Sequence, residues 1–392
     1  MKAKLIIIGA LGAAALNAFA GITIDQDKSE ADQAYEYIIG ENAGGWNALT
    51  VTNNATYTGS NITLTSATGD GATVAAGSTL VLHDSTITVN GASGNALMLS
   101  GNGAATAELY NVTISATGGY NVWAENGSTL TMVGGTIQNG GGGYGIVIYD
   151  TNTTSITGAT ITADVGIYVS AYTGASGTLK LTNSNINSYT ALWLENTNAT
   201  VALNDNTVAG NIRADNSTIA LSGSNSQITG AIVAATSGTV TVTLDGEGSV
   251  LHGNFNQDSG GAITLTLNAG ATLEGAGTVS ELTLNDGTTY IYTEGGLTVT
   301  DSITLGTITI DLSNLDADDL GEDLIVFDWG TLDVDISTDN FNFTGAGVAG
   351  AFSTDSDGNL IFNATAVPEP STWFLLGVGL GILALTRLCR RT

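Results

Sequence analysis

The sequence predicts an all-β protein, a right-handed parallel β-helix (a β-solenoid) with three short strands in each coil. From residue 77 onward the chain repeats a unit of about two dozen residues, each with three short segments of alternating apolar and polar residues. Prolines occur only at positions 368 and 370, so strands upstream of them can pair without interruption. One unit cannot bury its apolar side alone, whereas stacked units share a continuous core.

The three segments of each unit predict three columns of stacked strands, joined at corners rich in Gly and Asn. Alternation directs one apolar position of the second segment inward, and this inner column is expected to contain Ile87, Ile114, Ile137, Ile161, Ile186, Val208, Ile228 and Val250. The outward position of the first segment is expected to hold Val81, Glu108, Thr131, Ser155, Lys180, Ala202 and Ala220. The outward position of the third segment is expected to hold Met98, Trp123, Val147, Tyr168, Trp193, Arg213 and Val233. The hand should be right, as in nearly all parallel crossovers.

The spacing of the repeats divides the body into three parts. Residues 21–76 are expected to form an N-terminal cap and the first coils, and residues 77–261 the regular parallel β-helix. From residue 262 to 366 the spacing loosens, which predicts a degenerate end of the solenoid and a small β cap with a hairpin at Asp357-Gly358. Such a cap protects the open end of the stack from pairing with other chains.

The N-terminus, residues 1–20, has the three parts of a secretory signal peptide. A basic start at Lys2 and Lys4 precedes an apolar stretch, and Ala18 and Ala20 form an A-x-A cleavage site. We therefore expect export through the Sec machinery and a mature chain that starts near Gly21. A retained N-terminal anchor is the alternative.

The charge balance excludes a nucleic-acid partner. The chain has 8 basic and 36 acidic residues, and between the two ends only Lys28, Lys180 and Arg213 are basic. An exported body so strongly acidic repels nucleic acids and anionic lipids. The single cysteine, Cys389, lies in the C-terminal tail, so the body has no disulfide.

The last residues, 367–392, carry a second signal. Pro368, Glu369 and Pro370 precede a short apolar run, and Arg387, Arg390 and Arg391 follow it. This order resembles the PEP-CTERM sorting signal of Gram-negative bacteria. The resemblance implies that an exosortase cuts at the Pro-Glu-Pro element and delivers the protein to the cell surface, the outer membrane or an extracellular matrix. Since a bilayer-spanning helix usually needs about 20 apolar residues, this shorter run fits a transient transmembrane helix better than a permanent anchor, which is the alternative.

The repeat style of the body resembles the parallel β-helices of autotransporter-type and adhesin-type passenger domains. This implies a non-enzymatic role in adhesion, biofilm or exopolysaccharide association. The alternative is a carbohydrate-active enzyme, a polysaccharide lyase or hydrolase, because such enzymes also use this scaffold. They need paired carboxylates, or calcium-bound carboxylates with a basic residue. Arg213 has Asp205 and Asp215 near it in sequence, but no carboxylate pair occupies neighbouring outward positions, so we predict no catalytic residue.

Metal binding has only weak support in the sequence. The acidic stretches 316–323 and 355–359 resemble calcium loops, but the second lacks the closing Glu of an EF-hand. Ordinary acidic turns are favoured, with weak Ca²⁺ binding as the alternative, and neither a cofactor nor a metal site is predicted. His83 and His252 fall far apart along the predicted rod, so they should not share a site.

Trp123, Tyr168 and Trp193 are the predicted binding residues. Their neighbours Val122, Ile167 and Leu192 point inward, so these three side chains should form an exposed, partly aromatic stripe that contacts glycan or a partner surface. The alternative is a purely structural aromatic ladder. A lesser alternative for the whole protein is ice binding, which the mixed outward column of the first segment disfavours because it includes charges as well as Thr.

Overall fold

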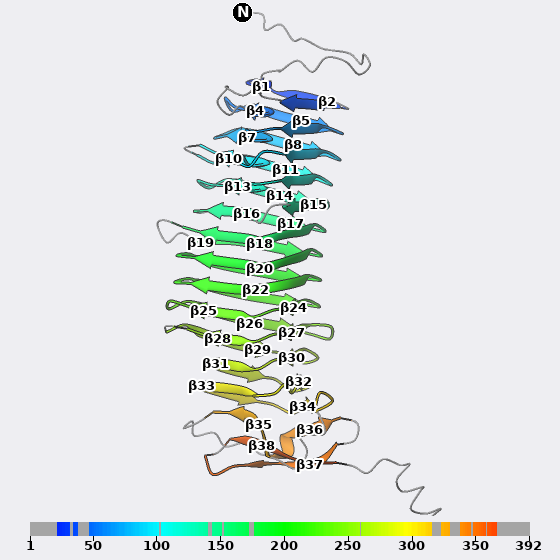
Figure 1. Cartoon of the computed structure of the whole chain (residues 1–392), viewed down its shortest axis with the longest axis vertical. Coiled ribbons are helices and arrows are strands. Elements are labelled where there is room, and N and C mark those ends of the chain that lie inside the picture. The colour runs from blue at the N-terminus through cyan, green and yellow to red at the C-terminus, as the bar shows by residue number, and fades with distance from the viewer. Residues whose placement is uncertain are drawn as a thin grey trace, which may run out of the picture.

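The computed structural model is one tall stack of short strands, with β1 at one end and β37 and β38 at the other (Figure 1). The structure describes residues 22–31, 34–37, 47–101, 103–139, 143–150, 153–171, 176–258, 260–315, 323–329, 338–345, 348–357 and 359–366. Both predicted end signals, residues 1–20 and 367–392, lie outside these ranges. Within them, no helix has the length and apolarity to cross a membrane.

Parallel strands form the three predicted columns. The first column contains β2 (Lys28–Ala31), β5 (Thr56–Ser60), β8 (Thr79–His83), β11 (Thr106–Tyr110), β14 (Thr129–Val133), β17 (Thr153–Thr157), β19 (Ser176–Thr182), β21 (Asn198–Asn204), β23 (Thr218–Ser224), β26 (Thr239–Asp245) and β29 (Ala262–Leu267). The second contains β3 (Ala34–Tyr37), β6 (Thr63–Ser66), β9 (Thr86–Val89), β12 (Thr113–Ala116), β15 (Thr136–Asn139), β24 (Gln227–Thr229), β27 (Val250–His252), β30 (Thr272–Glu274), β32 (Thr289–Ile291), β34 (Ile308–Asp311) and β36 (Phe341–Thr344). The third contains β1 (Ile22–Ile24), β4 (Leu49–Val51), β7 (Ala72–Ala75), β10 (Leu97–Ser100), β13 (Val122–Ala124), β16 (Tyr144–Tyr149), β25 (Ile232–Ala235), β28 (Phe255–Gln257) and β35 (Asp323–Asp328).

Some strands are long enough to bend through a corner and serve two columns. Three of them continue from the second column into the third: β18 (Thr160–Ser170), β20 (Asn185–Glu195) and β22 (Thr207–Asp215). Two others continue from the third column into the first: β31 (Gly277–Leu284) and β33 (Leu297–Leu305). The parallel pairing therefore runs across residue 262 without a break.

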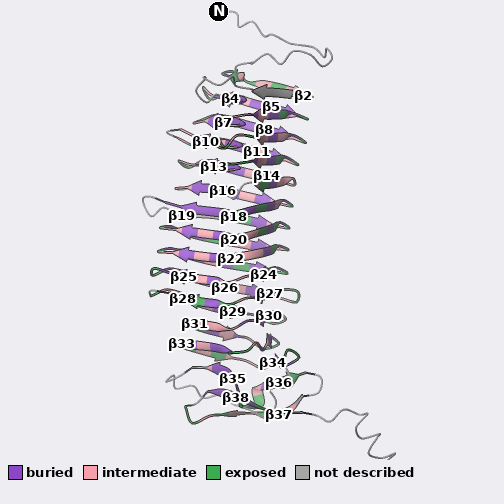
Figure 2. Ribbon diagram, viewed as in Figure 1, coloured by how far each residue is buried: buried purple, intermediate pink, exposed green. Residues whose placement is uncertain are grey.

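The inner positions of the columns stack into one continuous apolar core (Figure 2). Register pairs follow the predicted second-column ladder from Ile87 through Ile137 and Ile161 to Ile228. The prediction for Val250 is wrong, because Ile228 pairs with Leu251, which is buried, while Val250 faces outward. The corner before β27 contains the positive-φ glycines 246 and 248, and this longer corner shifts the alternation by one residue.

A second difference lies in the first column. Ala202 pairs with Ser222, two residues beyond the expected Ala220, which pairs with Thr200 instead. The preceding corner sets this register, because the hydroxyl of Ser217 reaches the coil before it and accepts a hydrogen bond from the backbone N–H of Thr197 (3.1 Å). A shift of two keeps every inward residue inward, so it costs no burial.

Short polar side chains build the corner between the first and second columns. A residue with positive φ recurs there at Asn61, Asp84, Asn111, Asn183, Asp205 and Asn225. Asn and Asp tolerate this left-handed conformation better than other non-glycine residues. One position later, a buried serine often bonds the adjacent coil: Ser85 Oγ accepts from the N–H of Ile62 (3.0 Å), and Ser226 Oγ from that of Asn206 (3.2 Å). At the corners, where strand pairing is interrupted, these serine side chains thus provide the hydrogen bonds between coils.

The C-terminal end of the stack is closed by an antiparallel cap. A short 3-10 turn, η2 (Thr338–Asn340), precedes β36, and β38 (Leu360–Ala366) pairs antiparallel with both β35 and β37 (Val348–Thr354). Thr354 pairs with Leu360, which confirms the predicted hairpin in this segment. Inside the cap, the rings of Phe341, Phe343, Phe352 and Phe362 contact one another.

Candidate functional site: an aromatic face on the third column

The outer surface of the third column has the register predicted from the sequence. Strand pairing places seven residues in adjacent coils in one row, in this order: Met98, Trp123, Val147, Tyr168, Trp193, Arg213 and Val233. Trp123 and Trp193 are half-buried. The prediction that Tyr168 is exposed is wrong, because its side chain is only 8% exposed.

Rings from neighbouring coils bury Tyr168. Its ring centroid lies 5.4 Å from that of Tyr144, 6.1 Å from that of Tyr149 and 5.2 Å from that of Trp193, all edge-on. Such T-shaped arrangements are favourable because the positive edge of one ring meets the negative face of another. Two more contacts extend the cluster, Trp123 with Tyr149 (4.8 Å) and Tyr120 with Trp123 (4.9 Å). We name the six residues Tyr120, Trp123, Tyr144, Tyr149, Tyr168 and Trp193 the aromatic face.

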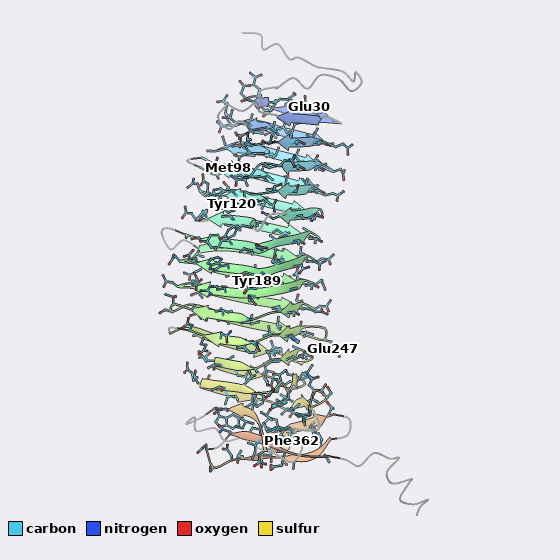
Figure 3. The ribbon with its side chains drawn as sticks, viewed as in Figure 1. Glu30, Met98, Tyr120, Tyr189, Glu247 and Phe362 are labelled. Atoms are coloured by element: carbon cyan, nitrogen blue, oxygen red, sulfur yellow. The ribbon has the colours of Figure 1, made fainter. Side chains whose placement is uncertain are left out.

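Three of these residues were missed by the sequence analysis: Tyr120, Tyr144 and Tyr149. They lie at the ends of the third segments or in the corner before them, outside the central position on which the alternation argument relied. Their spacing from Trp123 and Tyr168 could have identified them. Figure 3 shows Met98 and Tyr120 toward one side of the stack, and Tyr189 nearer the middle and farther toward the C-terminal end. Tyr189, also missed, is 79% exposed and lies on the same strand as Trp193.

Carboxylates hold the polar ends of the rings. The indole N–H of Trp123 donates to Glu125 Oε2 (3.2 Å), and that of Trp193 donates to Asp215 Oδ2 (2.8 Å). The hydroxyl of Tyr168 donates to Glu195 Oε2. The rings are therefore fixed in orientation, and each acceptor carboxylate is itself half-buried at the edge of the face.

This environment keeps the tyrosines protonated. Burial first, and then the hydrogen bond to Glu195, raise the pKa of Tyr168 well above its usual range. Burial also raises the pKa of Tyr144, with smaller contributions from Tyr120 and Glu195. Both groups remain neutral hydroxyls at any physiological pH, because their folded pKa values lie above the usual 10.0.

Arg213, which the sequence placed near two carboxylates, is bound by one of them. Its Nε and Nη2 donate to the two carboxylate oxygens of Asp215 at 2.6 and 2.8 Å, a bidentate pair. The bond to Asp215 is also the main reason that the pKa of Arg213 is raised. The guanidinium thus serves to orient Asp215, which in turn holds Trp193. Asp205, the other expected neighbour, lies at a corner and accepts from Asn225 Nδ2 (2.6 Å).

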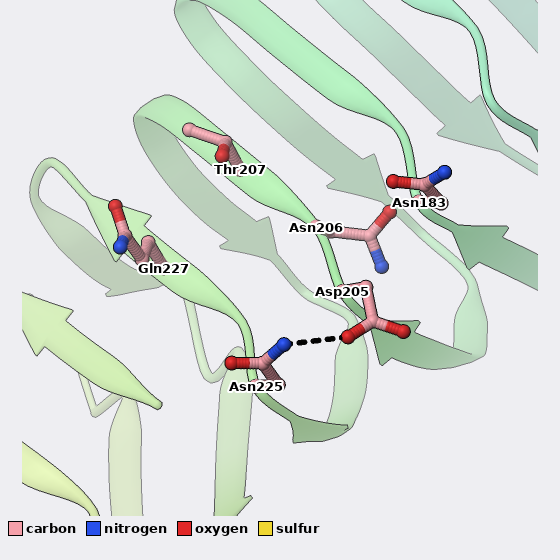
Figure 4. A pocket seen from close by; sticks show the side chains of 6 residues that line it. All are labelled: Asn183, Asp205, Asn206, Thr207, Asn225 and Gln227. Atoms are coloured by element: carbon pink, nitrogen blue, oxygen red, sulfur yellow. Dashed lines mark hydrogen bonds between the residues drawn. The ribbon is translucent and has the colours of Figure 1, made fainter. Parts of the chain in front are cut away.

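A shallow polar cavity of about 550 Å³ lies at the corner between the first and second columns (Figure 4). Its lining residues are Asn183, Asp205, Asn206, Thr207, Asn225 and Gln227. The most buried of them, Asn206, donates to the carbonyls of Leu181 and Asn204 (both 3.0 Å) and accepts from the N–H of Ser184 (2.8 Å). These bonds join consecutive coils, so this side chain supports the corner.

A set of threonines lies on the first column, beyond the outward positions considered in the sequence analysis. Thr241 and Thr243 pair in register with Thr264 and Thr266, and Thr266 pairs with Thr283. Glu281, exposed, interrupts the set next to Thr264. Two adjacent coils of this surface therefore have the Thr-x-Thr pattern in register with each other.

The remaining candidates are separate from the aromatic face. His83 stacks on Tyr110 of the first column (4.6 Å, 7° between planes), and His252 contacts Glu274 in the second (2.7 Å).

The two acidic stretches that resemble calcium loops show no metal site among their described residues. In the 355–359 turn, Asp355 accepts from the N–H groups of Asp357 and Asn359 (2.9 Å each), as in an ordinary Asx turn. The other acidic stretch spans residues 316–323, of which 316–322 lie outside the described residues. In the described part of the chain, no three His, Cys, Asp or Glu side chains are grouped to hold a metal ion.

Comparisons with known proteins agree with this geometry. Residues 39–186 match the right-handed β-helix region family, which supports the expected hand. Residues 366–391 match the PEP-CTERM protein-sorting motif, which includes Pro368, Glu369, Pro370, Arg387, Arg390 and Arg391. No curated protein matches the chain. The chain thus carries a PEP-CTERM sorting signal, which indicates export and sorting to the cell surface, and its body is a parallel β-helix.

Proposed function

We propose that this exported protein is a non-enzymatic rod of the cell surface or extracellular matrix, and that it associates with extracellular polysaccharide through the aromatic face. The observation that carries the proposal is the contact network of six rings on one outward surface, with carboxylates fixing the polar ends of three of them. Elsewhere the outward strand positions are mainly short polar residues. A surface patch of large rings is typical of an interaction site.

The chemistry of the rings suits a sugar chain. The C–H bonds on one side of a sugar ring are weakly positive and complement the negative face of an indole. Trp123 and Trp193 are half-buried, so each keeps part of its surface accessible, while Tyr168 supports Trp193 directly and Trp123 through Tyr149. Glu125 uses one carboxylate oxygen for the indole of Trp123, which leaves the other for a sugar hydroxyl at the edge of the face.

A binding assay with matched variants tests the proposal. We expect Trp123→Ala with Trp193→Ala to abolish retention of the exported protein on its own cells' extracellular polysaccharide. The control is His83→Ala with Tyr110→Ala, which removes a stacked ring pair of the first column. Unchanged retention of the Trp variant, with both proteins folded by circular dichroism, would leave the rings only a structural role.

The non-enzymatic part of the proposal needs its own test. The carbohydrate-active enzyme remains the alternative, since β-helices serve both purposes. Incubation with a panel of neutral and acidic polysaccharides, with and without Ca²⁺, should produce neither new reducing ends nor unsaturated products. A calcium-dependent release of unsaturated products would identify a lyase instead.

Processing by an exosortase is part of the same proposal. We expect intact mass of the protein recovered from the cell surface to show a chain that starts near Gly21, ends near Pro370 and lacks Cys389. A mass that includes Arg390 and Arg391 would show a retained C-terminal anchor.

The threonine pairs favour a second candidate function, binding of ice or ordered water. Thr241, Thr243, Thr264 and Thr266 present hydroxyl and methyl groups in register on a sheet surface. Thermal hysteresis that Thr264→Tyr abolishes, and that Trp193→Ala leaves intact, would support this function over the first.

A further inference from the structure

We infer that the aromatic face selects uncharged sugar chains and rejects acidic ones. The inference rests on the proposed function and specifies its ligand class. It follows from the charges around the rings, because three carboxylates there are fixed by hydrogen bonds from ring groups, and the cation beside them is held by one of the three. The relevant residues are Glu125, Glu195, Arg213 and Asp215.

The carboxylates form the border of the face. They belong to the third column or follow its strands directly, and they accept from ring N–H or O–H groups, so they cannot move away from a ligand without breaking these bonds. A uronate bound on the rings would bring a second negative charge to the same surface. Like charges within a few ångströms repel, and the half-buried setting weakens the screening by water.

A compensating cation is lacking on this face. Lys28 forms an ion pair with Glu30 in β2, at the N-terminal end of the stack. Lys180 lies on the first column, between Ser155 and Ala202. Arg213 does lie beside Trp193, but both carboxylate oxygens of Asp215 hold its guanidinium. Since the exported body has no other basic residue, an acidic glycan finds no free partner among the described residues of the face.

The carboxylates at the border do not repel an uncharged sugar chain. Sugar hydroxyls donate readily to ionised carboxylates, and these charge-assisted bonds are stronger than bonds between neutral groups. The same carboxylates that repel a uronate therefore attract a hexose. The aromatic face combines two requirements of neutral-sugar recognition, rings for stacking and acceptors at their border.

Two hexasaccharides with the same β-1,4 linkage test the inference: cellohexaose, which is neutral, and a mannuronate hexamer, which is acidic. By calorimetry on the full exported chain, we expect cellohexaose to bind at least tenfold more tightly at low salt. Raising the salt should strengthen binding of the acidic hexamer and leave that of cellohexaose unchanged, because salt screens only the repulsion.

Asp215→Asn sharpens the test. Asparagine keeps an oxygen for the indole N–H of Trp193 but removes the carboxylate charge that pairs with Arg213. We expect the ratio of the affinity for the mannuronate hexamer to the affinity for cellohexaose to rise at least fivefold. Asp205→Asn, which removes the same charge at a corner of the stack, is the control and should leave this ratio unchanged.

The outcomes separate this inference from the proposed function. Equal binding of both hexamers that is lost in Trp123→Ala with Trp193→Ala would overturn the charge selection and keep the glycan contact. Binding of cellohexaose that survives the Trp variant would overturn both. Failure of both hexamers to bind at millimolar concentration would also overturn both.

Discussion

The corner between the first and second columns and the aromatic face of the third column run along the same stack but differ in their chemistry. At the corner, positive-φ Asn or Asp recurs from Asn61 to Asn225, and buried hydroxyls bond coil to coil. The six rings of the aromatic face, in contrast, lie between Tyr120 and Trp193. Chemistry that repeats in many coils serves stacking, which every coil needs. Chemistry confined to a few coils needs another explanation, and binding is the one we propose.

The largest loss of stability is expected when a charge is placed in the core that all coils share. Ile161 is fully buried between Ile137 and Ile186 in the second column. Ile161→Asp should lower the free energy of unfolding by about 4 kcal/mol or more, since it buries an unpaired charge. Thr162→Asp, on the outward side of the same strand, should cost less than about 0.5 kcal/mol. Equal losses in urea denaturation would contradict the inward and outward assignment.

The next test concerns the corner itself. Asn206→Ala would leave the carbonyls of Leu181 and Asn204 and the N–H of Ser184 without their side-chain partner. Unsatisfied buried groups cost about 1–3 kcal/mol, so the midpoint of thermal unfolding should fall clearly. Thr207→Ala, exposed on the following residue, is the control. A change no larger than that of the control would mean that water replaces the amide.

A smaller effect is expected from the left-handed backbone alone. Asn225 has φ of 50°. Asn225→Ala and Asn225→Gly remove the same side chain and its bond to Asp205, but only alanine is strained at this φ. The alanine variant should therefore be less stable than the glycine variant by about 1 kcal/mol. Equal stability of the two in chemical denaturation would show that the side-chain bond, not the backbone, selects Asn here.

The smallest effect is a pH dependence of the aromatic face. The pKa of Tyr168 is raised in the folded protein, so its contribution to stability is complete below the usual tyrosine value of 10.0 and is lost as pH rises above it. Ultraviolet titration should detect a tyrosine that ionises only at a pH above 10, together with unfolding. Tyr168→Phe should reduce the amplitude of that late step by one tyrosine, since burial also raises the pKa values of Tyr144 and Tyr290.

The sequence predicted most of the fold because strand alternation and repeat spacing are local properties. The register from Trp123 to Val233 and the inner ladder from Ile87 to Ile228 follow from them. The errors at Val250 and Ala220 arose at corners, whose length depends on backbone conformation and on bonds between coils. The burial of Tyr168 could not be predicted from its own strand, because Tyr144 and Tyr149 cover it from the coil before.

The parallel pairing described above also determines how the rod responds to mechanical load. Its inter-coil hydrogen bonds point along the long axis, so a pull between the two ends strains them in tension. Each coil touches only its neighbours, and an end coil can peel away while the rest stays folded. A released coil of about two dozen residues adds about 80 Å of extended chain and shortens the stack by only about 4.8 Å. Under flow, such a rod would lengthen stepwise and limit the peak force on its attachment.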